Sequence, residues 1–140
     1  MRALLDTNVV CDWLLKRDPW RTEAETIAQW IEQGKLECLI AATTVTNLFY
    51  VARKLVGREV ALSHVGRCLT SFEICPVDYQ SLQEAHTLPS GNFEDNVQMI
   101  VAVLAAADCI VTRDAKGFPN PPLPVLPPSD FVSQLRATHP

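Results

Sequence analysis

Short apolar runs alternate along this chain with longer segments whose apolar residues recur every three or four positions. The short runs predict buried strands, and the three-to-four spacing predicts amphipathic helices. The predicted strands are residues 2–6, 37–41, 72–77 and 109–112. The predicted helices are residues 8–15, 21–33, 43–56, 58–70, 78–88 and 94–107. Strands that alternate with helices in this way predict an α/β fold, with a central parallel sheet covered by helices on both faces.

The C-terminal part of the chain breaks this alternation. Six of the ten prolines lie in residues 119–128, which excludes a helix interior or a central strand there. Val125 and Leu126 are expected to form a short edge strand, and Ser129 or Asp130 to cap a last helix through Leu135. With no internal repeat, the 140 residues are predicted to form a single domain.

Composition narrows the possible partners and compartment. Apolar residues make up 48% of the chain, enough for a core, and the net charge of −4 gives no bulk attraction for nucleic acid. Nucleic-acid contact would therefore need local basic clusters, such as Arg113 with Lys116. The five cysteines show no metal-site spacing, so they are expected to be free, buried thiols in a reducing cytosol. The sequence has neither a signal-peptide pattern nor a membrane-length apolar run, and we expect a cytoplasmic protein.

Acidic side chains stand where two of the predicted strands end. Asp6 closes the first strand, Asp114 follows the fourth, and Glu94 with Asp95 opens the apolar helix 94–107. Each has an ordinary structural explanation: Asp6 as a helix cap, Asp114 as a turn residue, and the other two as first-turn acids. Ligands of open α/β sheets bind at the carboxyl edge of the strands, however. If the two strands are neighbours, the acids converge on one pocket.

Crowded carboxylates repel one another unless a cation neutralises them. Oxygen ligands without cysteine or histidine favour Mg²⁺ or Mn²⁺ over zinc. Such a metal activates water and stabilises a phosphoryl transition state. The residues alone therefore point to a hard-cation site that can support this chemistry.

Three motifs, in matching order and spacing, resemble those of PIN-domain nucleases. They are Leu-Leu-Asp-Thr-Asn-Val-Val at residues 4–10, Phe-Glu-Asp-Asn-Val-Gln at 93–98, and Ile-Val-Thr-Arg-Asp-Ala-Lys-Gly-Phe at 110–118. The resemblance implies a three-layer α/β/α sandwich with a parallel sheet. It also implies a Mg²⁺- or Mn²⁺-dependent ribonuclease, commonly the toxin of a VapBC-type type II toxin–antitoxin pair.

The resemblance also implies roles for individual residues. Asp6, Asp95 and Asp114 would be the catalytic, metal-binding acids. Asn8 and Thr112 would orient carboxylates or a bound water, although local capping explains them equally well. Glu94 is either an accessory acid or a solvated first-turn acid. Arg113 and Lys116 flank the site, either as contacts to RNA phosphates or as ordinary solvated charges.

The second motif departs from the usual pattern of the family. Its customary glutamate is replaced by Asn47, which keeps a carbonyl oxygen but loses a negative charge. This chain resembles a bacterial branch that carries asparagine there. Asn47 would then tune metal binding; alternatively, it is a polar position near a helix start.

Family resemblance further implies an RNA substrate, a small antitoxin protein and a homodimer. An amphipathic antitoxin segment would lie in a groove between the early helices, lined by residues such as Trp13 or Tyr50 unless these belong to the core. The main alternative is a catalytically impaired PIN-fold module that binds RNA or a protein. A haloacid-dehalogenase-type phosphatase fails because Asn8 stands where its second acid is needed. A receiver domain fails because no paired acid follows Asp6.

Overall fold

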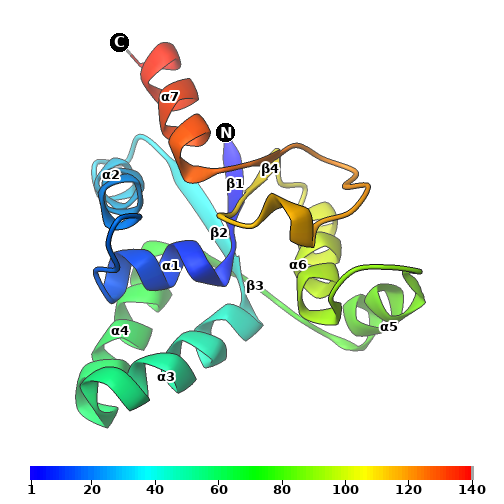
Figure 1. Ribbon diagram of the computed structural model, residues 1–140, viewed down its shortest axis with the longest axis horizontal. Helices are drawn as coiled ribbons and strands as arrows, with labels where there is room; N and C mark the ends of the chain where they lie inside the picture. Colours follow the sequence, from blue (N-terminus) through cyan, green and yellow to red (C-terminus); the bar gives the residue numbers. More distant parts are fainter. Residues whose placement is uncertain (140) are drawn as a thin grey trace.

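The computed structural model describes residues 1–139 and contains a five-stranded, all-parallel sheet in the order β3-β2-β1-β4-β5 (Figure 1). The strands are β1 Arg2–Leu5, β2 Glu37–Ala41, β3 Glu73–Cys75, β4 Cys109–Val111 and β5 Val125–Leu126. The helices are α1 Thr7–Leu14, α2 Arg21–Glu32, α3 Ala42–Val56, α4 Arg58–Ser71, α5 Tyr79–Thr87, α6 Phe93–Leu104 and α7 Pro128–Thr138, with a 3-10 turn η1 at Ala115–Gly117. The predicted α/β fold, with helices on both faces of a parallel sheet, is confirmed.

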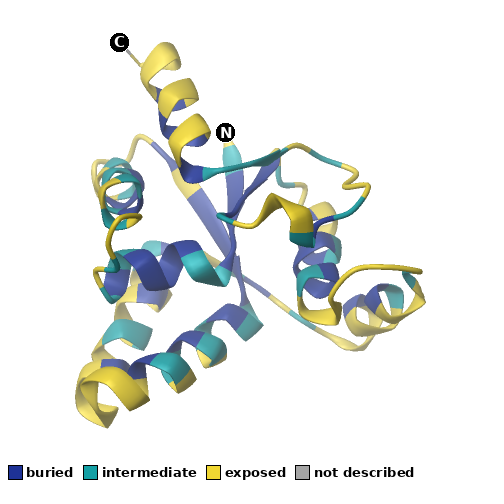
Figure 2. Ribbon diagram, in the orientation of Figure 1, coloured by how far each residue is buried: buried dark blue, intermediate teal, exposed yellow. Residues whose placement is uncertain are grey.

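The sheet separates two hydrophobic cores, because successive side chains of a strand point to opposite faces. Ala3 and Leu5 of β1 pack into the core that α1, α2, α3, α4 and α7 cover. Leu4, between them, packs into the core that α5 and α6 cover. Figure 1 shows these helices on either side of the sheet, and Figure 2 shows that the central strands are buried. The result is a three-layer sandwich with a double-sided core.

The strand order changes direction between β1 and β4. The chain first builds outward from β1 to β2 and β3, then returns to the other side of β1 to add β4 and β5. This reversal is the topological switch point at which open α/β sheets leave a crevice beyond the carboxyl ends of their strands. Asp6 follows β1 and Asp114 follows β4, so both acids lie at this crevice.

Several predicted boundaries are wrong. The helix predicted over 94–107 is Phe93–Leu104, since Ala106 adopts a left-handed φ of 56° and the Ala107 N–H bonds back to the Ala102 carbonyl. Such a Schellman-type ending satisfies the last carbonyls where the chain must turn into β4. Alanine favours helix, so the sequence alone hides this end.

Other elements are shifted by a few residues. The strand predicted to reach Asp6 ends at Leu5, and the one predicted over 72–77 is only Glu73–Cys75, because Asp78 caps α5. The last helix begins at Pro128 rather than after Ser129 or Asp130, and it continues to Thr138. Proline suits the first helical position, where no N–H is needed. The edge strand at Val125–Leu126 is confirmed.

The remaining sequence predictions concern thiols and membrane spans. All five cysteines are free and buried, as predicted, and burial raises the pKa of the Cys11 thiol to about 11. Within residues 1–139, none of the helices has the length and apolar character to span a bilayer.

Trp13 packs half-buried against the core beside Phe72, whereas Tyr50 is 58% exposed on α3.

Candidate metal-binding nuclease site

Asp6 is held at the centre of the site by four hydrogen bonds, and it is only 6% exposed. Its Oδ1 accepts from the Thr7 backbone N–H and from Gln98 Nε2, both at 2.6 Å. Its Oδ2 accepts from Thr112 Oγ1 at 2.7 Å and from Asn8 Nδ2 at 3.3 Å. The residue is thus a helix N-cap, as its position allowed, and also a fixed carboxylate shared by β1, α6 and β4. The long Asn8 bond is the weakest of the four.

The first turn of α6 supplies two more carboxylates. Asn92 caps this helix, its Oδ1 accepting from the Glu94 N–H at 2.9 Å and the Asp95 N–H at 3.3 Å. Asp95 and Gln98 are three residues apart and share one face of the helix. The same face therefore presents an acid to the crevice and a donor to Asp6.

Asp114 lies just after β4 and is exposed. Its backbone N–H donates to Thr112 Oγ1 at 3.0 Å, so one threonine fixes Asp6 and the turn that carries Asp114. Gly117 lies against both outer acids: a Cβ there would come within 2.5 Å of Asp95 Oδ2 and 3.6 Å of Asp114 Oδ2. The missing side chain at Gly117 leaves room for the Asp95 carboxylate.

The crowding of acids is visible in the electrostatics of Asp95. Burial is the largest influence, and together with the charges of Asp6, Glu94 and Asp114 it raises the pKa of Asp95 to about 6. A nearby cation would stabilise the ionised form of this carboxyl. This shift is the electrostatic signature expected of an acid cluster built for a positive charge.

The three acids line one cavity of about 360 Å³, together with Asn8, Arg17 and others. Among residues 1–139, no three acidic, histidine or cysteine side chains converge tightly enough to form a ready-made metal cluster. The donor set nevertheless fits a hard cation: it consists of carboxylate oxygens, and Mg²⁺ usually keeps several waters, so the carboxylates need not close tightly around it. The residues present suit Mg²⁺ or Mn²⁺ better than zinc.

Asn47 lies beside this cavity and contacts its rim. Its Nδ2 donates to Glu94 Oε1 at 2.9 Å, so α3 and the start of α6 are joined there by an amide–carboxylate bond. Glu94 lines the cavity, and Asn47 reaches it through Glu94. In this structure Asn47 therefore holds the carboxylate of Glu94, an acid that lines the cavity.

The two basic residues predicted near the site are placed differently. Lys116 is exposed in η1, whereas Arg113 is held by the buried Asp12, with its Nε and Nη2 donating at 2.6 and 3.2 Å. Asp12 also accepts from Arg17 Nε at 2.8 Å. The Arg113 guanidinium lies 3.7 Å from the centre of the Trp20 ring.

Sequence reasoning missed three residues of this region. Gln98 had one available signal, its spacing of three from Asp95 on an otherwise apolar helix. Asp12 had another, a single acid among the apolar residues of α1. Gly117 stands in the motif at 110–118, but its role depends on how closely the chain approaches Asp95, which the sequence does not reveal.

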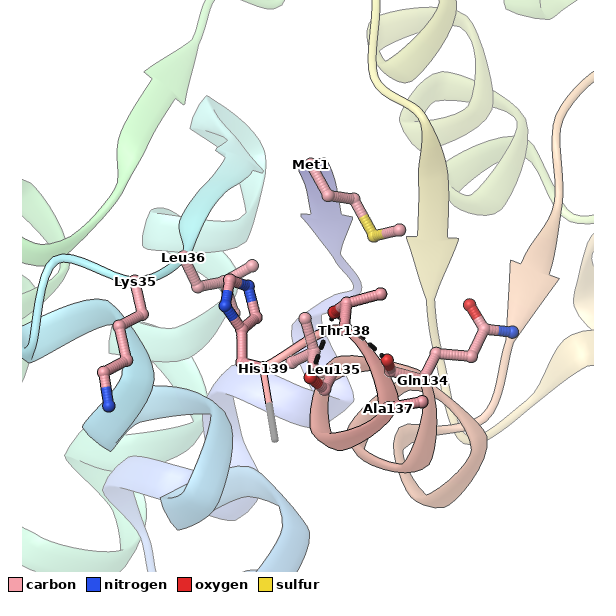
Figure 3. A pocket seen from close by; sticks show the side chains of 8 residues that line it. All are labelled: Met1, Lys35, Leu36, Gln134, Leu135, Ala137, Thr138 and His139. Carbon is pink, nitrogen blue, oxygen red and sulfur yellow. Dashed lines mark hydrogen bonds between the residues drawn. The ribbon is translucent and has the colours of Figure 1, made fainter.

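A cavity of about 430 Å³ lies at the opposite edge of the sheet (Figure 3). It is formed by Met1, Lys35, Leu36 and the end of α7, including Leu135 and His139. Carboxylate side chains do not figure among the described residues that line it. The acid cavity is therefore the better candidate for chemistry.

Solved structures share this fold. The VapBC2 complex of Rickettsia felis, bound to a promoter DNA fragment, is 23% identical with a TM-score of 0.63, over 89% of this chain and 97% of that one. A toxin–antitoxin complex from Klebsiella pneumoniae is 22% identical with a TM-score of 0.67, over 90% and 97%. The Mycobacterium tuberculosis toxin VapC20, which cleaves the sarcin-ricin loop, is 11% identical with a TM-score of 0.61, over 77% and 86%.

Sequence comparison identifies the family. The chain matches no curated protein at a significant level. The family model for the PIN domain matches residues 2–116, which span the acids at positions 6, 95 and 114 and most of the sheet. This chain therefore belongs to the PIN-domain family.

Proposed function

We propose that this protein is a metal-dependent ribonuclease, the toxin of a type II toxin–antitoxin pair, and that residues 1–140 form one PIN domain. The observation that supports this most directly is that Asp6, Asp95 and Asp114, far apart in sequence, line one cavity at the switch point of the sheet. Membership of the PIN family and the similarity to VapC toxin folds support the same conclusion.

In this proposal Asp6, Asp95 and Asp114 would hold Mg²⁺ or Mn²⁺. A bound ion would supply a water activated for attack on a phosphodiester and a positive charge opposite the charge that develops on the phosphate. The protein's own contribution is positioning. Thr112 and Gln98 fix both oxygens of Asp6, and Gly117 leaves space for Asp95.

Three neighbours complete the site in this proposal. Asn8 is a positioning residue, because its Nδ2 reaches Asp6 Oδ2 and its Oδ1 accepts from the Arg113 N–H at 3.4 Å. Glu94 is an accessory acid at the rim, restrained by Asn47. Lys116, exposed in η1, would contact a phosphate of the RNA.

The test is cleavage of a labelled single-stranded RNA. Cleavage should stop in EDTA and return with Mn²⁺, and Asp95→Asn and Asp114→Asn should each lower the rate by about 100-fold or more. These two variants are better probes than Asp6→Asn, because an amide at Asp6 would also replace one oxygen, which accepts two hydrogen bonds, by an NH2 donor. Asp108→Asn is the matched control: Asp108 is exposed and accepts from the Arg2 N–H at the opposite edge of the sheet. Cleavage that persists in EDTA would contradict the mechanism.

A second candidate function is a PIN-fold module that binds RNA or a protein without efficient catalysis. The observation in its favour is Asn47, which brings an amide where the family usually has a carboxylate, and which donates to Glu94. The same assay decides between the two. Tight RNA binding without Mn²⁺-dependent turnover would favour the binding module.

We further propose a small antitoxin partner and a homodimer. The support for the antitoxin is the toxin–antitoxin complexes among the similar folds, and the large apolar side chains left exposed on α3 and α4. The homodimer is proposed by analogy with the family alone. Tyr50, Leu55, Val60 and Leu69 are each 46% exposed or more. An amphipathic antitoxin segment would cover such a surface. Co-expression of the protein encoded beside this gene should suppress toxicity and co-purify; if neither occurs, the toxin–antitoxin assignment fails while the nuclease assignment stands.

A further inference from the structure

A second cleft of about 360 Å³ lies on the α2–α7 side of the acid site, and the functions proposed above make no use of it. Its walls include Pro19, Trp20, Glu23, Arg113, Pro128 and Ser129. Rigid rings and one planar cation thus make up most of the cleft. Two hydrogen-bonding side chains, Glu23 and Ser129, complete it.

The ring of Trp20 is held in place by the side chain of Arg113. Trp20 is 42% exposed, and the Arg113 guanidinium covers one side of its ring at 3.7 Å from the ring centre. Arg113 cannot swing away easily, because two of its nitrogens donate to Asp12, which is 1% exposed. An indole backed by an anchored guanidinium is a preformed stacking surface.

Arg113 lines the cleft and is next in sequence to residues of the acid site. Arg113 lies between Thr112, which fixes Asp6, and Asp114, which lines the acid cavity. The Arg113 backbone N–H also donates to Asn8 Oδ1 at 3.4 Å. Arg113 of the cleft and Asp114 of the acid cavity are consecutive residues, so one short backbone segment carries parts of both.

We propose that this cleft is a subsite for one unpaired nucleobase of the RNA, next to the phosphodiester at the acid site. This inference deepens the proposed ribonuclease function and rests on it. Proteins bind single-stranded RNA by stacking splayed bases on aromatic rings and guanidinium planes, which is the surface that Trp20 and Arg113 form. Glu23 adds an acceptor for an exocyclic amine, which selects cytosine, adenine or guanine over uracil.

The test measures RNA affinity in EDTA, where binding is separated from turnover. A fluorescent eight-nucleotide single-stranded RNA is compared with a series in which each base in turn is removed. Trp20→Ala should weaken binding of the intact RNA by about 5- to 150-fold, the range for loss of one stacking aromatic. Trp20→Tyr, which keeps a ring, should bind within about threefold of the wild type. One RNA of the abasic series should bind the wild-type protein as weakly as the intact RNA binds Trp20→Ala. That same abasic RNA should bind Trp20→Ala no more weakly than the intact RNA does.

Two further readouts keep the test decisive. Tyr79→Ala is the control for loss of an exposed aromatic: Tyr79 is 77% exposed, and its neighbours Asp78 and Gln80 line a cavity with Arg2 at the opposite edge of the sheet. Its RNA affinity should be unchanged. If Trp20→Ala fails to fold, the wild-type protein still reports through tryptophan fluorescence. RNA should quench that fluorescence, and the quenching should be lost with the one abasic RNA and in Trp20→Tyr.

The outcomes separate this inference from the ribonuclease proposal. If the RNA is cleaved but its affinity depends neither on Trp20 nor on any single base, the subsite proposal is wrong. The cleft would then be a site for a segment of a partner protein. RNA that binds with the expected Trp20 dependence but is never cleaved overturns the ribonuclease proposal and leaves the subsite standing.

Discussion

At the scale of single residues, the site depends on side chains whose only role is to place other side chains. Gln98 and Thr112 each donate to a different oxygen of Asp6, at 2.6 and 2.7 Å, and both are buried. Gly117 contributes by having no side chain where Asp95 needs space. The geometry of the acids is therefore set by neutral neighbours, and it can be disturbed without removing any charge.

Gly117→Ala tests this dependence. The added methyl group would come within 2.5 Å of Asp95 Oδ2, so the carboxylate must move while the fold has little reason to change. We expect RNA cleavage to fall by about 10-fold or more, in line with a displaced ligand, with the melting temperature altered by only a few degrees. Gly66→Ala is the matched control, because its Cβ meets nothing within 4 Å; it should keep full activity and stabilise α4 by roughly 0.5–1 kcal/mol. Equal activities of the two variants would show that Gly117 has no positional role.

Gln98→Met tests the buried donor. Methionine has a similar size but leaves Asp6 Oδ1 without one of its hydrogen bonds. Removing a hydrogen bond to a charged group should cost about 1.5–3 kcal/mol in the free energy of unfolding and should lower cleavage by about 10-fold. Urea unfolding and initial cleavage rates measure the two effects. Gln134→Met, on α7 at the opposite edge, should change neither; a Gln98 variant as stable and active as wild type would mean that the Asp6–Gln98 bond is dispensable.

At the scale of elements, the first turn of α6 brings Asp95 and Glu94 to carboxylates from β1 and β4. Burial, together with the proximity of these groups, raises the pKa of Asp95 to about 6. The consequence for stability has a definite sign. A carboxyl whose folded-state pKa is raised binds its proton more tightly in the native state, so the metal-free protein loses stability as pH rises through this range.

The pH dependence of unfolding measures this effect. In EDTA, the difference in stability between Asp95→Asn and wild type should grow in favour of the variant as pH rises from about 4 to above 6. The neutral side chain avoids both the burial of a charge and the repulsion from Asp6, Glu94 and Asp114. Urea melts at pH 4.5 and pH 7.5 provide the comparison, and Asp108→Asn serves as the control. A constant difference across this range would mean that Asp95 ionises normally in the folded state.

The meeting of the strand ends at one edge of the sheet could be predicted from the sequence, whereas the contacts between helices and the sheet could not. Asp6 and Asp114 could be placed at one edge because parallel strands bring their carboxyl ends together, and because short motifs mark both strand ends. The Gln98–Asp6 bond and the stack of Arg113 on Trp20 could not be predicted, since both depend on how α6 and α2 rotate against the sheet. The end of α6 was misplaced because Ala105 to Ala107 favour helix while the fold requires a turn.

At the scale of the whole molecule, the parallel sheet assembles one acidic centre from segments more than 100 residues apart. Asp6 and Thr112 are separated by 106 positions and are joined by a single hydrogen bond. Net charge of −4 works against RNA binding, so the acids and the few nearby cations must be arranged locally. A bound divalent ion would neutralise part of this negative charge. Metal binding is therefore expected to affect both the stability of the protein and its affinity for RNA.

Asn47→Glu tests this link, because it adds one negative charge at the rim of the acid cavity. Asn47 now donates to Glu94 at 2.9 Å, and a glutamate there would replace that bond by repulsion between two carboxylates. The melting temperature in EDTA should therefore fall or stay level, while Mn²⁺ affinity should rise, since affinity for a divalent ion follows the charge of its ligands. Titration calorimetry with Mn²⁺ and melting curves in EDTA measure these opposite changes. Thr46→Glu adds the same charge at an exposed neighbouring position of α3 and should leave Mn²⁺ affinity nearly unchanged. Unchanged Mn²⁺ affinity and unchanged metal-free stability in Asn47→Glu would place residue 47 outside the metal site and would contradict its role in tuning the ion.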